Sequence, residues 1–189
     1  MNRQPGARKT QILETLASML EQPHSARITT AALAKELNLS EAALYRHFPC
    51  KAAIFKDLIH LIETLIFEDS HHINGTEPKG RRQLGKQVHA LLLFAERHRG
   101  LTRVLTGDAL ATEDWQLQAQ LDHLIADIEA MLRQSALEAA HELPPGSDAG
   151  IMASLLMHWV LGRWLRYVQT SWRVPPAEGY ARELALLGL

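Results

Sequence analysis

Apolar side chains recur along most of the chain at intervals of three and four residues, the spacing of helices that bury one face. The pattern predicts long helices at residues 8–22, 52–69, 81–99, 112–142 and 150–171, with a short closing helix at 180–189. Residues 70–80, SHHINGTEPKG, have the composition of a loop. Abundant Ala and Leu suit helices packed on helices, so the expected fold class is all-α.

The stretch at residues 28–51 differs from the long helices, because it predicts two short helices joined by a tight turn. Thr29 or Thr30 is a suitable N-cap for the first helix, and Ser40 is a suitable N-cap for the second. Between them, Asn38 tolerates the left-handed conformation that a helix end often needs. A following proline limits the second helix to about two turns. Such a helix needs a scaffold, because it is too short to be stable alone.

A short helix carried behind a tight turn is the arrangement that places side chains in the major groove of DNA. Small side chains at its start would let the backbone approach base edges, and hydroxyl and basic side chains at its end suit phosphate oxygens. The residues expected to contact DNA are Thr29, Thr30, Ser40, Ala42, Ala43, Tyr45, Arg46, His47 and Lys51. The spacing alone leaves an alternative, an ordinary helical hairpin with a solvated charged face.

The run ITTAALAKELNLSEAALYRHFPCK resembles the DNA-binding motif of the TetR family of bacterial regulators, most clearly in Y-x-H-F followed by a short turn and lysine. The resemblance implies a TetR-like helical homodimer with an N-terminal helix-turn-helix head and a C-terminal helical body. It places the DNA-binding domain at residues 1–51, connected through helix four at 52–69, and assigns 52–189 to dimerisation and partner binding. Cys50 departs from the family pattern, in which an oxygen-bearing cap is usual at that position.

Two of the long helices have patterns expected at an interface between two copies of the chain. The helix at 112–142, with Thr112 as its N-cap, has apolar residues in alternating steps of four and three, like a coiled-coil seam. These residues are Leu117, Leu121, Leu124, Ile128 and Met131. The helix at 150–171 is apolar on nearly all sides, which favours burial against a partner chain. A core helix of a monomer is the alternative.

Charge and cysteine content narrow the class of protein. The net charge is −1, but residues 1–52 hold seven Lys or Arg against four acids, a balance of +3 that leaves −4 for the rest. A mildly basic head on a mildly acidic body is consistent with local phosphate contact. Cys50 is the only cysteine, so no intrachain disulfide is possible, and we expect a cytoplasmic, nucleoid-associated protein without a signal peptide.

Other functional classes find little support in the sequence. The most apolar run, Ile151–Leu165, contains His158 and Arg163 and is shorter than the roughly 20 residues of a membrane span. The adjacent His71 and His72 have no carboxylate or cysteine at ligand spacing, so no metal site is expected. No glycine-rich phosphate loop or catalytic triad spacing is present, which favours a protein that is not an enzyme and needs no cofactor.

The run ERHRGLTRVLTGDAL at 96–110, the RITT before the head motif and the following W-x-L-x-x-x-L helix are similar to the nucleoid occlusion branch of the TetR family. This resemblance implies that the protein binds palindromic chromosomal sites and, while on DNA, binds the division GTPase FtsZ. Binding of FtsZ would block septal ring assembly over the nucleoid. The acidic FtsZ tail would lie between helices four and five, on Leu61, Leu65, Leu93, Arg97 and His98. Two positions depart from the branch, Asp69 where a basic residue is expected and Arg99 in place of a proline.

A ligand-responsive transcriptional repressor is the rival interpretation. Such proteins hold a small molecule inside the helical body, and the ligand changes the spacing of the two heads. Trp115, Trp159 and Trp164 could line a cavity of this kind, although residues of this type more often form the core. An enclosed pocket of several hundred Å³ would support this interpretation.

Overall fold

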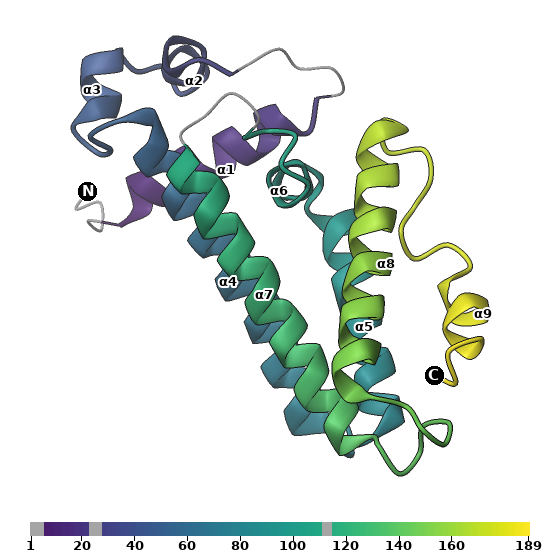
Figure 1. The fold of residues 1–189 in the computed structure, drawn as a ribbon. Coiled ribbons are helices and arrows are strands. Elements are labelled where there is room, and N and C mark those ends of the chain that lie inside the picture. The colour runs from purple at the N-terminus through teal and green to yellow at the C-terminus, as the bar shows by residue number, and fades with distance from the viewer. Residues whose placement is uncertain (1–5, 23–27, 111–114) are drawn as a thin grey trace. The chain divides into compact units, whose positions relative to one another are not determined.

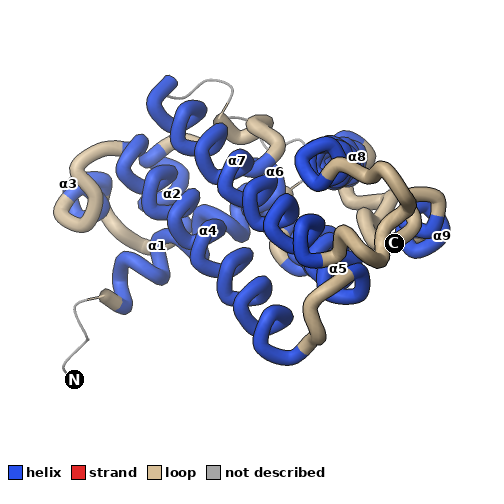
Figure 2. The backbone as a smooth tube through the Cα atoms, turned by 60° about the horizontal axis from the view of Figure 1, so that its bottom comes forward, coloured by secondary structure: helices blue, strands red, loops and turns tan. Residues whose placement is uncertain are grey.

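The computed structural model describes residues 6–22, 28–110 and 115–189, and the regular structure in these ranges is helical, which confirms the all-α prediction (Figures 1 and 2). The helices are α1 (Ala7–Leu20), α2 (Thr30–Glu36), α3 (Glu41–Tyr45), α4 (Lys51–Thr76), α5 (Arg81–Arg97), α6 (Arg99–Leu105), α7 (Trp115–Glu138), α8 (Ala149–Gln169) and α9 (Tyr180–Ala185). The predicted cap Thr112 lies outside the described residues.

The helices form two compact units. The first contains the described residues up to Ile62 together with those of His98–Leu121, and the second contains Glu63–Arg97 and Asp122–Leu189. Helices α4 and α7 each contribute residues to both units. None of the helices in the described ranges is both long and apolar enough to cross a membrane.

In the first unit, α6 packs against α1 at Gly100. A Cβ atom at this position would lie 1.9 Å from the carbonyl oxygen of Ala17, so only glycine permits the observed approach. The sequence predicted a helix up to Arg99, and this prediction was wrong at its end. Helix α5 ends at Arg97, His98 has the non-helical angles φ −128° and ψ 62°, and the glycine lies inside α6.

Arg103 fastens the end of α1 to α6 within the same unit. Its Nη1 donates to the carbonyl oxygens of Leu20 at 3.2 Å and Gln22 at 3.5 Å, and its Nε donates to Asp108 at 2.6 Å. Carbonyl groups at a helix C-terminus lack partners in their own helix, so the guanidinium satisfies them. Gly107, with φ +74°, follows the end of α6 and has the left-handed conformation that glycine favours.

Helix α4 is longer than the sequence predicted. It continues to Thr76, so the predicted helix at 52–69 was too short and the predicted loop at 70–80 was wrong for most of its length. Two side chains of this helical segment form hydrogen bonds. Thr76 donates to the carbonyl oxygen of His72, and Asn74 accepts from Gln87 of α5 at 2.9 Å. The remaining link to α5 is short.

Glu77 stabilises that link by pairing with two basic side chains of α5. Its carboxylate lies 2.9 Å from the Nε of Arg82 and also accepts from Lys86. The hydrogen bond from Lys86 holds the pKa of the Glu77 carboxyl below its ordinary value.

The core of the second unit lies between α5 and α8, which run side by side (Figure 1). Trp164 of α8 is fully buried, and its indole Nε1 donates to the carbonyl oxygen of Leu91 at 3.0 Å. The Asp148 side chain caps α8 by accepting from the backbone of Ile151 at 2.9 Å. Helix α9 begins at Tyr180 as predicted but ends earlier than predicted, at Ala185.

Arg163 holds the segment before α9 against α8. The guanidinium donates to the carbonyl oxygens of Pro176 and Glu178, the second at 2.9 Å, and pairs with the Glu183 carboxylate. The Trp159 indole donates to the same carboxylate at 2.8 Å. Helix α9 is therefore held to α8 by polar contacts, in addition to the buried side chain of Leu184 and the stacking of Tyr180 on His89 of α5.

Candidate nucleic-acid interface and partner groove

Two side-chain caps and one left-handed residue define the helix-turn-helix. The Thr29 hydroxyl accepts from the backbone of Ala32 at 3.1 Å and begins α2, and the Ser40 hydroxyl accepts from the backbone of Ala43 at 3.1 Å and begins α3. Asn38 has φ +54°, which confirms the predicted turn conformation. Each cap satisfies a backbone donor that the helix leaves unpaired. Thr29 and Ser40 therefore have a structural role in addition to the predicted contact with DNA.

A chain of side-chain hydrogen bonds connects α2 to α3. The Tyr45 hydroxyl donates to the Thr30 hydroxyl at 3.3 Å, and the Thr30 hydroxyl donates to the Glu41 carboxylate at 3.4 Å. Leu44, which precedes Tyr45 in α3, is fully buried. The two short helices thus hold a fixed mutual angle with Tyr45 at the surface. Sequence analysis did not identify Glu41 as a member of this group, although its position in the first turn of α3 could have suggested it.

The remaining candidate DNA-binding residues of this unit lie at or near the surface. Ala42 and Arg46 are exposed, and Ala43 and His47 are half-buried. The Lys51 ammonium lies 5.5 Å from the centre of the Phe55 ring, a cation–π contact that positions it at the start of α4. Small side chains on α3 are therefore followed by basic side chains after its end, and their contact with DNA stays a prediction.

The predicted partner-binding residues are divided between the two units. Leu65, Leu93 and Arg97 belong to the second unit, whereas Leu61 and His98 belong to the first. Within the second unit, Leu65 of α4 and Leu93 of α5 are half-buried and Arg97 is exposed. Three of the five candidates therefore lie in the same unit.

An ion pair joins α4 to α5 at these residues. The Arg97 Nη2 lies 2.5 Å from a carboxylate oxygen of Asp69, and the Arg97 Nε donates to the carbonyl oxygen of Leu93 at 3.4 Å. Both charged side chains remain substantially accessible, at 51% for Arg97 and 40% for Asp69. Asp69, which departs from the family pattern, is therefore the direct partner of a candidate functional arginine.

A small hollow lies between the same two helices. Its volume is about 10 Å³, which is room for about one water molecule. It is lined by Ile66, Asp69, Ser70, Ile73, Gln87, Ala90, Leu91, Phe94 and Met131. The buried Gln87 donates from its Nε2 to Asn74, but its Oε1 has no hydrogen-bond partner among the described residues. The lining of the hollow is therefore mostly apolar, with Asp69, Ser70 and Gln87 as its polar members.

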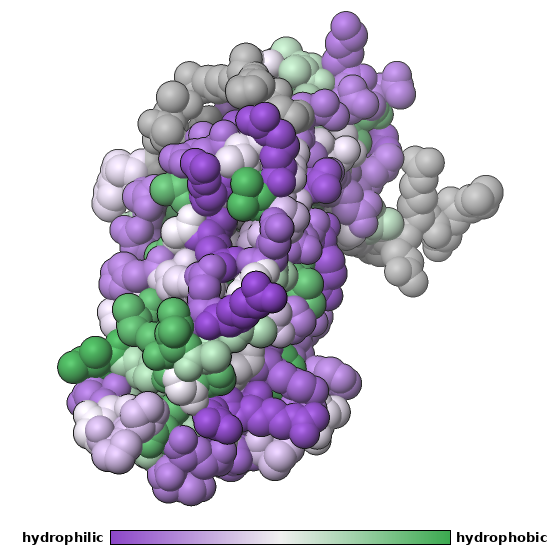
Figure 3. Space-filling model, turned by 90° about the vertical axis from the view of Figure 1, so that its right-hand side faces the viewer, coloured by the Kyte–Doolittle hydropathy of each residue, from purple (hydrophilic) through white to green (hydrophobic). Residues whose placement is uncertain are grey.

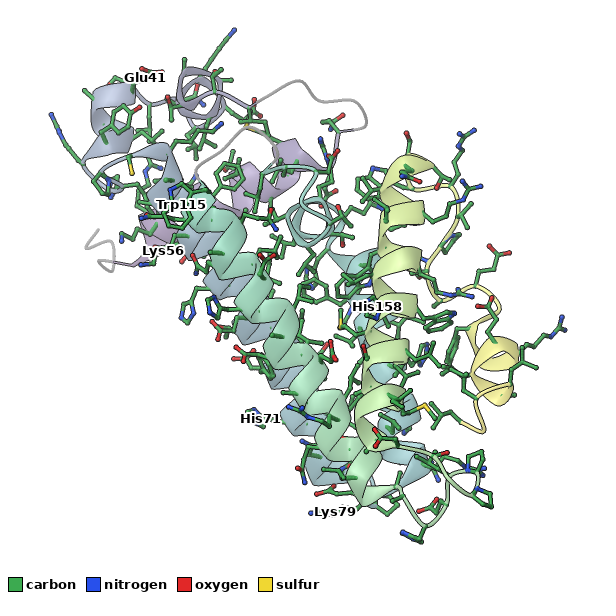
Figure 4. All side chains as sticks on the ribbon, in the orientation of Figure 1. Glu41, Lys56, His71, Lys79, Trp115 and His158 are labelled. Carbon is green, nitrogen blue, oxygen red and sulfur yellow. The ribbon has the colours of Figure 1, made fainter. Side chains whose placement is uncertain are left out.

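The tryptophans considered for a ligand cavity have different surroundings. Trp164 is buried and hydrogen-bonded in the core, and Trp115 is 76% exposed. Trp159 lines a hollow of about 540 Å³ beside α8, together with Arg163, Pro176 and other residues of that side. This hollow is open to solvent, whereas the predicted ligand chamber is enclosed. His71, considered for metal binding, is exposed on α4, and the described residues contain no cluster of three or more metal-ligating side chains (Figure 4).

Family models match both halves of the chain. Residues 12–58 match the model described as bacterial regulatory proteins, tetR family. Residues 82–188 match an SlmA-like model described as tetracyclin repressor-like, C-terminal domain. The first match covers the helix-turn-helix, and the second covers α5 through α9.

Related sequences belong to the same family. A protein of Aliivibrio fischeri strain MJ11 named nucleoid occlusion factor SlmA is 40% identical over 185 residues, which cover 95% of this chain and 93% of the relative. A Marinomonas protein of the same name is 39% identical over 189 residues, covering 99% and 96%.

The crystal structure of the regulator FadR from Bacillus subtilis with stearoyl-CoA has a TM-score of 0.75, at 13% identity and 95% and 98% coverage. A TetR-like regulator from Rhodococcus has a TM-score of 0.74, at 17% identity and 99% and 98% coverage. At these identities the solved structures establish the fold alone, and they confirm the TetR-like prediction. The chain, a DNA-binding regulator by its head and its relatives, belongs to the SlmA nucleoid occlusion factors of the TetR family.

Proposed function

We propose that this protein is a homodimeric nucleoid occlusion factor. It binds palindromic chromosomal sites through its two helix-turn-helix heads and, while on DNA, binds FtsZ and antagonises septal ring assembly over the nucleoid. The observation that carries the proposal is 40% identity over 95% of the chain to a protein named nucleoid occlusion factor. Similarity of this extent includes the body of the protein as well as the DNA-binding head.

The surface of α3 supports the DNA-binding part of the proposal. The Ser40 cap fixes the start of the helix, and the small residues of α3 and the basic residues after it match the chemistry of base edges and phosphates. Because phosphate contacts dominate affinity, binding should weaken steeply as salt is added.

Arg46→Ala is expected to weaken DNA binding about tenfold, because it removes one charge-assisted phosphate contact. The slope of log affinity against log salt should fall by about one for each lost contact. Lys56→Ala removes the same charge from an exposed position on α4 of the same unit, apart from α3, and should leave both quantities unchanged (Figure 4). Fluorescence anisotropy at several salt concentrations measures both effects, and equal behaviour of the two variants would contradict the head assignment.

The exposed face of α8 supports the dimeric part of the proposal. Apolar side chains gather on the side of the second unit that carries α8 and α9 (Figure 3). Three large apolar side chains of α8 are exposed to solvent: Ile151 at 71%, Leu155 at 47% and Leu165 at 43%. Gly162, beside them, would meet no atom within 4 Å if it carried a Cβ, so another helix could approach closely there. A two-fold interface on this face would match the symmetry of palindromic DNA.

Leu155→Lys should convert the dimer into a monomer and weaken DNA binding with it. The dimer dissociation constant is expected to rise about a hundredfold or more. Each chain carries the substitution, so a two-fold interface would bury two unpaired lysine charges. Leu186→Lys makes the same change at a leucine that is 86% exposed beyond α9, and should leave the dimer intact. Analytical ultracentrifugation measures the outcome, and a Leu155→Lys protein that stays dimeric would remove α8 from the interface.

The decisive test of function measures whether the immobilised protein retains purified FtsZ, with and without DNA. The DNA fragments are those that the protein binds in a selection from the genome that encodes it. We expect retention that increases when the selected DNA is present and does not increase with scrambled DNA of equal length. Failure to retain FtsZ under any of these conditions would overturn the proposal and leave a transcriptional role for the same fold.

A further inference from the structure

The Arg97–Asp69 ion pair occupies the position at which the proposed partner would bind. Arginine recognises carboxylates through a planar set of donors. Arg97 already donates from its Nη2 to the carboxylate of Asp69 at 2.5 Å. The pair bridges α4 and α5 beside the half-buried leucines Leu65 and Leu93. An acidic peptide arriving here meets an arginine whose nearest acceptor is supplied by the protein itself.

The hollow that Asp69 helps to line is too small for a peptide side chain. Its volume is only about 10 Å³, and its other lining residues include the apolar Ile66 and Phe94. An apolar side chain of a bound peptide could enter it only if a lining side chain moved, and Asp69 is one of these. A movement of Asp69 would also release Arg97.

We propose that Asp69 is an internal competitor for Arg97 and sets the affinity of the α4–α5 surface for acidic, apolar-containing peptides. The proposal rests on the function proposed above. A peptide carboxylate replaces that of Asp69 on the guanidinium, and the Asp69 carboxylate turns into solvent. Both side chains are about half exposed, so the pair is weak enough to exchange and lowers affinity without blocking the site.

The test compares binding of a fluorescein-labelled peptide of the acidic C-terminal tail of FtsZ to four forms of the full-length protein. Asp69→Asn keeps the size of the side chain and removes the competing charge, so we expect binding to be about two- to fivefold tighter. Glu68→Gln makes the same charge change at the neighbouring exposed residue of α4 and should bind like the wild type. Adding Arg97→Gln to Asp69→Asn should abolish the gain, because the released group is then absent.

The outcomes separate this inference from the function on which it rests. Equal affinities for wild type, Asp69→Asn and Glu68→Gln would overturn the inference alone. Weaker binding by Asp69→Asn would also overturn it, since Asp69 would then position Arg97 for the peptide. If neither the peptide nor intact FtsZ binds any form, the proposed function fails and the inference fails with it.

Discussion

Gly100→Ala should destabilise the protein by about 1–3 kcal/mol, because the added methyl group overpacks the contact between α6 and α1. The new Cβ would lie 1.9 Å from the carbonyl oxygen of Ala17 and 3.2 Å from the Cβ of Leu20. The first of these atoms belongs to a helical backbone and cannot rotate away, so one helix must shift. Because α1 packs against α2 of the head, DNA affinity should fall as well.

Gly85→Ala provides the matched control for this prediction. Gly85 lies within α5, and a Cβ there would meet no atom within 4 Å. The same substitution should therefore stabilise the protein by up to about 1 kcal/mol, the helix propensity difference between the two residues. Urea unfolding followed by circular dichroism, at one fixed protein concentration, measures both variants. Similar midpoints for the two would show that α1 and α6 accommodate the methyl group.

Arg97→Asp should weaken FtsZ binding at least about a hundredfold and leave DNA affinity within about twofold, because like charges across an interface are strongly unfavourable. The change removes the guanidinium and places a second carboxylate beside Asp69. Arg97 lies in the second unit, whereas the helix-turn-helix belongs to the first. Co-sedimentation with FtsZ polymers and DNA anisotropy measure the two activities separately.

Arg182→Asp makes the same charge reversal at an exposed position on α9 and should preserve both activities. If Arg97→Asp loses FtsZ and DNA binding together while its helical content and unfolding midpoint stay unchanged, the two sites are not separate. Loss of FtsZ binding by both reversals would instead indicate a general effect of net charge.

The head was predictable from the sequence because its geometry is local. Thr29 and Ser40 cap helices whose first turns they adjoin, and Asn38 adopts the left-handed conformation that its own short side chain tolerates. Each of these features depends on residues at most four positions apart. The hydrogen-bonded group of Tyr45, Thr30 and Glu41 was not predicted, because it joins two helices.

The features of the body that sequence analysis missed depend on contacts between distant residues. Residues 70–76 have loop-like composition, yet they remain helical and contribute Ser70 and Asn74 as partners for Gln87 of α5. The predicted helix at 81–99 placed Gly100 just past a helix end, where glycine is common. The structure places it inside α6. Its actual role depends on Ala17, more than eighty positions earlier, which no local pattern reveals.

The single cysteine provides a direct route to the proposed assembly. Cys50 is exposed and directly precedes the first residue of α4, at the exit of the helix-turn-helix. A maleimide spin label will therefore attach at one known position per chain without any mutation. In a two-fold dimer the two labels form one pair, and dipolar spectroscopy will report the separation of the two heads with and without DNA.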